Sequence, residues 1–287
     1  MEVVHAVAPL RARIQAWRQA GDRVALVPTM GNLHEGHLSL VEEARRQAER
    51  VVVSVFVNPL QFGPGEDFDR YPRTLAADTE ALMRAPCDLL YAPLLSEMYP
   101  RGAAPVTQIS VPDISETLEG AFRPGHFDGV ATVVSLLLHQ VLPDVACFGQ
   151  KDYQQLAVIR RMVSDQQMPV AIVGVPTCRA DDGLALSSRN QYLSADERRR
   201  APRIKATLDA VAAALRSGRR DYAALERDAT AALSAAGFQP QYVAVRTPTL
   251  ETPDAHANAW VVLVAAFLGS TRLIDNLEVQ DDDGADR

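Results

Sequence analysis

Short apolar segments alternate with longer amphipathic segments over the first 176 residues of the chain. The apolar segments are rich in β-branched residues, which is typical of strands that are buried on both faces. They lie at residues 24–29, 51–57, 89–92, 145–148 and 169–176. In the segments between them, apolar residues recur at helical spacing. This alternation predicts an α/β fold with a doubly wound, mostly parallel, Rossmann-like sheet.

The most apolar helical segment lies at residues 129–141. It is apolar nearly all round, so we expect it to be buried in the middle of the domain. A further short strand is expected at residues 106–111, between Pro105 and Pro112. The most apolar stretch, residues 130–142, contains His139 and Gln140 and is shorter than the roughly 20 residues that span a bilayer. No long apolar segment follows the N-terminus, so neither a membrane anchor nor a signal peptide is expected.

The composition changes after residue 176, where two Ala- and Arg-rich helices are expected before three strands. Ser194 and Glu197 have the spacing of a capping box at the start of the first helix. The strands are expected near residues 241–246, 259–267 and 271–275. Helices followed by antiparallel strands are typical of a small α+β domain. We therefore expect a Rossmann-like domain at residues 1–177 and a smaller C-terminal α+β lid domain at residues 178–287.

The overall composition indicates which broad classes of protein the chain can belong to. Of the 287 residues, 47% are hydrophobic and 23% are charged, which indicates an ordinary globular protein rather than a disordered one. The formal net charge of -7 argues against nucleic-acid binding, because a duplex-binding protein needs a basic face. Cys87, Cys147 and Cys178 are widely spaced and odd in number, which fits a cytoplasmic protein with reduced thiols.

A loop with two glycines and two histidines follows the first apolar segment. Pro28 ends the strand, because proline cannot donate to a ladder, and the helical pattern begins at His37. His34 and His37 therefore lie where a strand is followed by a helix N-terminus. Free backbone N–H groups and the positive end of the helix dipole suit a phosphate at such a place. The same pair is also compatible with a metal half-site or with two surface histidines.

Polar residues follow the second strand as well. Asn58 and Gln61 come directly after residues 51–57. Ligands bind at the carboxyl ends of strands in open α/β sheets, so these side chains are candidates for binding a substrate. A plain turn built on Asn58 and Pro59 would produce the same pattern.

Two further clusters have the same chemical character as the histidine pair. One follows the strand at residues 145–148 and contains Gly149, Lys151 and Asp152. The other lies in the polar segment 179–189 and contains Ser187, Ser188 and Arg189. Each offers cationic groups, hydroxyls or backbone N–H groups to an anion. This order of clusters is similar to that of nucleotidyl-transferring folds.

Seven short stretches of the chain have sequences that, taken together, are specific enough to indicate a protein family. They are VPTMGNLHEGH (27–37), FVNPLQF (56–62), YPRT (71–74), RPGHF (123–127), FGQKDYQQL (148–156), DGLALSSRN (182–190) and LIDN (273–276). The first contains the HxGH signature of the class I nucleotidyltransferases. With all seven, the chain closely resembles the pantothenate synthetases, the pantoate–β-alanine ligases of coenzyme A biosynthesis. The resemblance covers nearly the whole chain and is densest over residues 26–192.

The resemblance implies a two-step reaction. ATP and pantoate give pantoyl adenylate and pyrophosphate, and β-alanine then attacks the acyl carbon to release pantothenate and AMP. A carboxylate is already ionised near neutral pH, so it can attack the α-phosphate without a strong base. The enzyme must position it in line and neutralise charge on the phosphates, which is mostly electrostatic work.

The resemblance also implies the roles of individual residues. His34, His37 and Lys151 are the implied catalytic residues, with His37 as proton donor. Gln61 and Gln155 would bind pantoate, and Gln61 would also reach β-alanine. The implied ATP-binding residues are Met30, Gly31, Asn32, Leu33, His34, Glu35, Gly36, His37, Gly149, Gln150, Lys151, Asp152, Cys178, Leu186, Ser187, Ser188 and Arg189.

The implied cofactor and partners follow from the same resemblance. ATP would be a substrate, and Mg²⁺ would travel with its phosphates rather than occupy an all-protein metal site. Asn58 would orient the residues around pantoate. The family relation also implies a homodimer formed through the larger domain.

Two other functions fit part of the pattern. An adenylyl- or cytidylyltransferase acting on another acid or a phosphate would share the histidine and serine clusters, but it would not need Gln61 and Gln155. A binding or regulatory protein would keep the nucleotide site without turnover. Gln150 fits that alternative, because the family usually has Gly-Glu-Lys-Asp where this chain has Gly149-Gln150-Lys151-Asp152. We expect an active enzyme, because a carboxylate nucleophile needs no base.

Overall fold

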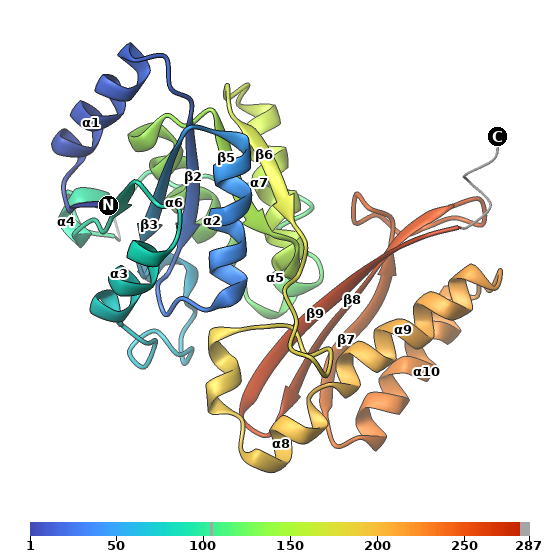
Figure 1. Ribbon diagram of the computed structural model, residues 1–287. Helices are drawn as coiled ribbons and strands as arrows, with labels where there is room; N and C mark the ends of the chain where they lie inside the picture. The colour runs from blue at the N-terminus through green and yellow to red at the C-terminus, as the bar shows by residue number, and fades with distance from the viewer. Residues whose placement is uncertain (104–105, 282–287) are drawn as a thin grey trace. The chain divides into compact units, whose positions relative to one another are not determined.

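The computed structural model describes residues 1–103 and 106–281. The described residues form two compact units, whose elements are labelled in Figure 1. Unit 1 comprises residues 1–150 and 154–176, and unit 2 comprises residues 151–153 and the chain from residue 177 onward. The main boundary in the chain thus falls between residues 176 and 177.

Within the described residues, unit 1 is built on a six-stranded parallel sheet in the order β1-β4-β3-β2-β5-β6. Its strands are β1 (Glu2–Val4), β2 (Val24–Thr29), β3 (Arg50–Val55), β4 (Leu89–Tyr91), β5 (Val145–Gly149) and β6 (Ala171–Val175). The chain adds β3 and β4 on one side of β2, and then β5 and β6 on the other. The doubly wound, Rossmann-like sheet expected from the sequence is confirmed.

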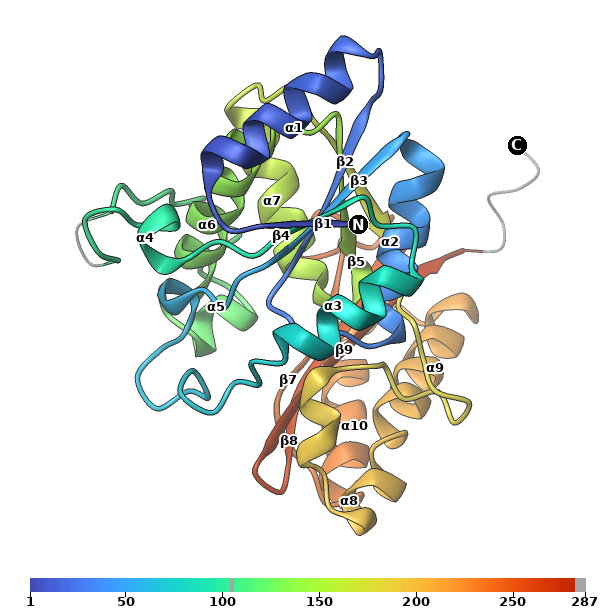
Figure 2. The same ribbon diagram turned by 60° about the vertical axis from the view of Figure 1, so that its left-hand side comes forward.

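Helices cover both faces of this sheet (Figure 2). One face carries α2 (Glu35–Gln47) and α3 (Leu75–Arg84), and the other carries α1 (Val7–Gln19), α6 (His126–Val141) and α7 (Tyr153–Asp165). The shorter helical segments of this part of the chain are α4 (Leu95–Met98), α5 (Glu119–Phe122) and the 3-10 turns η1 (Pro59–Gln61) and η2 (Gln150–Asp152).

Strand β2 contributes to a separate core on each face, because successive side chains of a strand point to opposite sides. Val24 and Leu26 pack in the cluster that contains α1, α6 and α7. Ala25 and Val27 pack in the cluster that contains α2 and α3. All four side chains are fully buried. This explains why β2 has a continuous apolar sequence rather than an alternating one.

Helix α6 is buried over most of its length, as its composition predicts. The strand expected at residues 106–111 is absent from the described part of that segment, so this prediction was wrong. The N–H of Ile109 donates instead to Oγ1 of Thr132 in α6, at 2.9 Å. A helix side chain therefore provides the acceptor that a neighbouring strand would otherwise supply.

In the described residues, unit 2 is a three-stranded antiparallel sheet, ordered β7-β8-β9, that packs against two helices, α9 and α10. Its elements are η3 (Ser188–Tyr192), α8 (Ala195–Arg200), α9 (Arg203–Arg216), α10 (Tyr222–Ala235), β7 (Gln239–Arg246), β8 (Ala259–Leu268) and β9 (Thr271–Gln280). Ser194 and Glu197 form the expected capping box. The long helix expected to follow it is divided into α8 and α9 at Pro202, which is the N-cap of α9.

No helix of the described chain combines the length and the apolar character needed to cross a membrane. Cys87, Cys147 and Cys178 are free thiols. Burial raises the pKa of Cys87 to about 11 and that of Cys147 to about 12, so neither thiol is nucleophilic at neutral pH.

Candidate active site

Three polar segments of the chain begin at the carboxyl ends of three adjacent strands. Strands β3, β2 and β5 are neighbours in the sheet and end at Val55, Thr29 and Gly149. The N–H of Phe56 donates to the carbonyl oxygen of Thr29 at 3.1 Å, so two of these segments leave the sheet side by side. The strand order reverses between β2 and β5, and open α/β sheets bind ligands at such a reversal. This edge of the sheet is therefore the candidate site.

His34 and His37 close the N-terminus of α2 through a reciprocal pair of hydrogen bonds. His34 is the N-cap residue, and its Nδ1 accepts from the N–H of Gly36 at 3.1 Å. The Nδ1 of His37 accepts from the N–H of His34 at 3.3 Å. Since both rings use Nδ1 as an acceptor, the neutral form of each imidazole carries its proton on Nε2.

The two imidazoles lie together at the start of the helix. Their ring centroids are 4.1 Å apart and their planes are inclined by 43°. Two Nε2–H donors beside the positive end of a helix dipole suit an anion such as a phosphate. The described residues contain no group of three or more His, Cys, Asp or Glu side chains that could hold a metal ion. The geometry therefore favours the anion-binding interpretation over the metal half-site.

The backbone N–H groups of the loop before α2 are not free, contrary to the expectation from the sequence. The N–H of Gly31 donates to Oγ1 of Thr29 at 3.2 Å. The N–H groups of Asn32 and Leu33 donate to the carboxyl group of Asp78 at 3.1 and 2.8 Å. Asp78 belongs to α3, and its carboxyl group accepts from two consecutive N–H groups of this loop. The two imidazoles, rather than these N–H groups, are thus the candidate donors to an anion.

A buried set of hydrogen bonds fixes the amide groups of Asn58 and Gln61. Oδ1 of Asn58 accepts from the hydroxyl of Tyr99 at 2.6 Å and from the N–H of Leu60 at 3.2 Å. Nδ2 of Asn58 donates to the carbonyl oxygen of Gly129 at 3.0 Å and to Oε1 of Gln61 at 3.1 Å. The backbone groups of Leu60 and Gly129 fix which end of Asn58 is oxygen. The amide of Gln61 is consequently fixed too, with Oε1 as the end that accepts from Asn58 and Nε2 as the other end.

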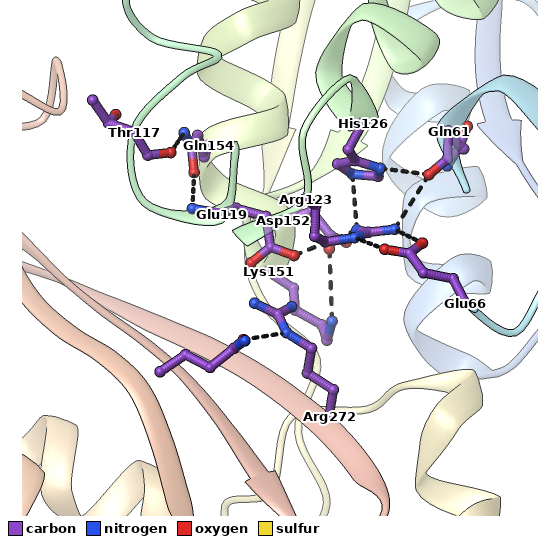
Figure 3. Close-up of polar contacts among 11 residues, drawn as sticks. Gln61, Glu66, Thr117, Glu119, Arg123, His126, Lys151, Asp152, Gln154 and Arg272 are labelled. Carbon is purple, nitrogen blue, oxygen red and sulfur yellow. Dashed lines mark hydrogen bonds and ion pairs between the residues drawn. The ribbon is translucent and has the colours of Figure 1, made fainter. Parts of the chain in front are cut away.

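The carbonyl oxygen of Gln61 is held by His126, the first residue of α6, and by Arg123, which precedes that helix (Figure 3). Nδ1 of His126 lies 2.8 Å from the carbonyl oxygen of Gln61, and Nη2 of Arg123 lies 3.3 Å from the same oxygen. Nη1 of Arg123 lies 3.0 Å from Nε2 of His126. Because Arg123 can only donate, Nε2 of His126 accepts and its Nδ1 carries the proton that binds Gln61.

Arg123 also joins this group to two carboxylates. It binds Glu66 through two parallel hydrogen bonds of 2.7 and 2.6 Å, and it lies 3.4 Å from Glu119. Burial opposes ionisation of Glu66, but the hydrogen bonds and charge of Arg123 outweigh it and lower the pKa of this carboxyl. Burial and, second, the charge of Arg123 lower the pKa of His126 to about 4. His126 is thus neutral under ordinary conditions, as its two hydrogen bonds require.

Two adjacent glutamines at the start of α7 have different surroundings. Nε2 of Gln154 donates to the carbonyl oxygen of Ile114 at 2.7 Å. It also donates to the carbonyl oxygen of Thr117 at 2.8 Å, and Oε1 accepts from the N–H of Glu119 at 3.0 Å (Figure 3). Gln154 is therefore buried, and its amide group is used in hydrogen bonds that hold the backbone. Gln155 is half-buried and, one position along the helix, points in another direction. It remains the candidate for a ligand.

The segment after β5 turns through η2 before α7 begins. Lys151 and Asp152 form an ion pair, with Nζ and Oδ1 3.7 Å apart. The carbonyl oxygen of Lys151 accepts from Nδ2 of Asn276 at 2.8 Å, which fixes the Lys151 backbone within unit 2. Gly149 and Gln150 belong to unit 1.

The third cluster is organised within unit 2. The N–H of Leu186 donates to the carbonyl oxygen of Cys178 at 2.9 Å, so these two expected ATP-site residues lie together. Oγ of Ser187 accepts from the N–H of Arg189 at 3.3 Å at the start of η3. Arg179 anchors this segment through two hydrogen bonds of 2.7 and 2.9 Å to Asp275 in β9.

Three residues with a clear place in this geometry were not singled out from the sequence. Asp78 and Tyr99 are buried polar groups, and each bonds to a residue more than 40 positions away. No local pattern marks either of them. His126 lies in the RPGHF stretch, but a buried histidine in a turn-rich segment does not reveal its partner.

A model of the family described as "Pantoate-beta-alanine ligase" matches residues 2–278. The chain belongs to the pantoate–β-alanine ligase family. This ligase is 57% identical over 278 residues to the pantothenate synthetase of Pseudomonas entomophila (strain L48), covering 96% of this chain and 97% of the relative. It is 58% identical over 280 residues to that of Stutzerimonas stutzeri (strain A1501), covering 97% and 98%.

Solved structures agree with this assignment. The pantothenate synthetase of Thermus thermophilus superposes on the ligase with a TM-score of 0.91 at 49% identity, covering 98% of this chain and 100% of that one. The pantoate–β-alanine ligase of Francisella tularensis, solved in complex with "Beta-gamma ATP and Beta-alanine", gives a TM-score of 0.81 at 32% identity, covering 96% and 97%. The ligase joins pantoate to β-alanine to give pantothenate. A nucleotidyltransferase for another acid and a non-catalytic binding protein are thereby set aside.

The buried neutral His126 should make folding stability depend on pH. Its pKa is about 4 in the folded chain, against about 6.5 in an unfolded one. Between these values the unfolded chain binds more protons, so the free energy of unfolding should fall as the pH is lowered from about 6.5 to about 4. The full contribution of this residue is about 3 kcal/mol. Urea unfolding at a series of pH values measures it.

The matched variants for this experiment are His126→Asn and His256→Asn. His126→Asn keeps a donor toward Gln61 but does not titrate, so its stability should change less over that pH range. His256 is exposed in unit 2, and its replacement should leave the slope of the wild type. Identical slopes for the wild type and His126→Asn would contradict the assignment.

Proposed function

We propose that the ligase activates pantoate with ATP. Pantoate and ATP form pantoyl adenylate and pyrophosphate, and β-alanine then displaces AMP to form the amide. The observation that carries this proposal is the pair of Nε2–H donors that His34 and His37 hold at the N-terminus of α2. The complex named for the Francisella tularensis relative supports ATP and β-alanine as ligands.

The chemistry of adenylation explains why such donors are needed. The pantoate carboxylate attacks the α-phosphorus, the bond from the α-phosphorus to the bridging oxygen breaks, and pyrophosphate leaves with the electron pair. Negative charge therefore grows on the leaving phosphates in the transition state. Fixed donors at that position stabilise this charge without reorganising. We assign this role to His34, His37 and Lys151, with His37 as proton donor to the leaving group.

The remaining nucleotide contacts follow from the family resemblance. The residues from Met30 to His37 would line one side of ATP, and those from Gly149 to Asp152 would hold ribose and phosphate. Cys178 and the residues from Leu186 to Arg189 would close over adenine and triphosphate. The hydrogen bond between Cys178 and Leu186 supports treating these two as one binding segment.

Pantoate would bind through Gln61 and Gln155, and β-alanine would also contact Gln61. The fixed polarity of the Gln61 amide supports this role, because Nε2 donates and both substrates carry carboxylate oxygens that accept. Asn58 and Tyr99 would act as positioning residues for that amide. Gln155 is preferred to Gln154, since the polar atoms of Gln154 are already bonded within unit 1.

We further propose that Mg²⁺ enters with ATP. Carboxylate-rich cages are typical of resident divalent ions, and the described residues offer no such cluster. The ligase would act in the cytoplasm as a homodimer. Its free cysteines fit a reducing compartment.

Isotope exchange between pyrophosphate and ATP tests the order of the two steps. Pantoate alone should support exchange, because adenylate forms before the amine is needed. His37→Ala should slow exchange about 10²-fold or more, since it removes a preorganised donor. His256→Ala, at an exposed position, should keep the wild-type rate. A requirement for β-alanine would exclude the two-step reaction, and normal exchange in His37→Ala would exclude the histidine role.

Gln61→Glu tests the polarity of the pantoate contact. The carboxylate has nearly the same shape and can still accept from Asn58, but it offers no proton to pantoate and repels its charge. The KM for pantoate should rise at least about tenfold while the KM for ATP changes little. Gln15→Glu, which adds the same charge at an exposed position of α1, is the control. An unchanged KM for pantoate would show that Gln61 does not donate to it.

Gln150→Glu tests the position at which the chain departs from the family pattern. Glutamine keeps the shape and one acceptor of glutamate, and the carboxylate nucleophile needs no base. The substitution should therefore change kcat/KM less than about tenfold, or roughly 1.4 kcal/mol of barrier. Lys151→Ala should cost far more, because it removes the charge assigned to the phosphates. An inactive wild type that Gln150→Glu activates would contradict this assignment.

A further inference from the structure

Asp78 is a buried acid. The donors to its carboxyl group come from the loop before α2 and from the start of its own helix, α3. The residue is 2% exposed. It accepts from the N–H groups of Asn32 and Leu33 at 3.1 and 2.8 Å, and from the hydroxyl of Thr74 at 3.1 Å. Within the described residues, no Lys or Arg forms an ion pair with it. Backbone N–H groups thus compensate for the burial of this carboxyl.

The loop has the backbone shape that gathers N–H groups around an anion. Gly31 and Asn32 are consecutive residues with left-handed backbones, at φ values of 82° and 52°. Successive N–H groups in such turns form a concave site for a negative charge. Here Asp78, rather than an external anion, fills that concavity.

The fit between the loop and Asp78 is close. A Cβ atom added to Gly31 would lie 2.9 Å from Oδ2 of Asp78 and 3.1 Å from Cγ1 of Val55. Both distances are shorter than an ordinary van der Waals contact of a Cβ atom. Glycine at this position therefore permits the left-handed turn and also leaves room for the carboxyl group of Asp78 beneath it.

We propose that Asp78 is a positioning residue for His34 and His37, an inference that rests on the proposed adenylation chemistry. Leu33 is bonded directly to Asp78, and His34 follows Leu33 in the chain. The reciprocal cap then ties the ring of His37 to the backbone of His34. Asp78 thus sets the place from which both imidazoles extend. By filling the concavity, it also keeps phosphate from binding the loop backbone instead of the rings.

Removing this carboxyl should impair adenylation more than it impairs pantoate binding. Asp78→Ala leaves the N–H groups of Asn32 and Leu33 without their acceptor, so the loop must shift to satisfy them. A displacement of about 1 Å at reacting groups costs about 10²-fold in rate. We expect exchange between pyrophosphate and ATP to slow by about 10-fold to 100-fold. The KM for pantoate should stay within about threefold, because Gln61 is held by a separate set of hydrogen bonds.

Asp144 provides a matched control at the opposite end of β2, the strand that precedes the loop held by Asp78. Its Oδ2 accepts from the N–H of Val24, the first residue of β2, at 2.8 Å. Asp144→Ala removes the same kind of bond from carboxylate to backbone, but it does so far from the loop that Asp78 holds. It should lower the melting temperature while leaving the exchange rate per folded molecule at the wild-type value.

Asp78→Asn keeps the test informative if the alanine variant does not fold. Asparagine has nearly the same shape and one acceptor oxygen, but its NH2 group cannot accept the second N–H. Exchange should therefore fall by an intermediate amount.

Thr74→Val and Thr74→Ser test the same carboxyl group through its neighbour, since valine removes the hydroxyl that donates to Asp78 and serine keeps it. The serine variant should retain more activity than the valine variant.

The outcomes separate this inference from the function on which it rests. Slow exchange in both His37→Ala and the Asp78 variants, with an unchanged KM for pantoate, supports it. Slow exchange in His37→Ala with normal exchange in folded Asp78→Asn overturns the positioning role and leaves the proposed function intact. Equal rates of exchange per folded molecule in the Asp78 and Asp144 variants would also overturn the positioning role of Asp78. Normal exchange in His37→Ala would instead refute the proposed role of the histidines.

Discussion

The hydrogen bonds that the protein makes to one end of each polar side chain determine what the other end offers to a ligand. Backbone N–H groups occupy Nδ1 of His34 and His37, so Nε2 carries the proton in the neutral rings. Asn58 donates to Oε1 of Gln61, so Nε2 is the end that would meet pantoate in the proposed complex. These donors are oriented before any substrate arrives, and preorganised donors stabilise developing charge without the cost of reorganisation.

The parallel sheet explains why such side chains gather at one edge. Strand β2 is covered on both faces, so its interior positions can carry only apolar residues. Polar chemistry must follow the strand rather than lie within it. Reversal of the strand order between β2 and β5 leaves the carboxyl edge open at that point. The fold thereby concentrates the segments after β2, β3 and β5.

The sequence predicted what local patterns can specify and missed what depends on distant partners. Buried strands leave continuous apolar runs, and loops that follow them reveal their glycines and polar residues, so the sheet and the histidine loop were predictable. The bonds from Asp78 to Asn32 and from Tyr99 to Asn58 span 46 and 41 positions, and no periodicity records them. The expectation of free N–H groups failed for this reason, because the acid that binds them comes from another helix.

The hydrogen bonds of Arg123 bear on how the proposed reaction would keep the pantoate carboxylate nucleophilic. A guanidinium has five N–H donors. Those of Arg123 contact Glu66, Glu119, His126 and the carbonyl oxygen of Gln61. This cation is thus used to hold the chain, and in the proposed reaction the pantoate carboxylate meets the neutral amide of Gln61. An ion pair would withdraw electron density from the attacking oxygen, whereas an amide donor orients the carboxylate and leaves it more nucleophilic. Cationic groups are then best placed on the leaving phosphates, where negative charge grows.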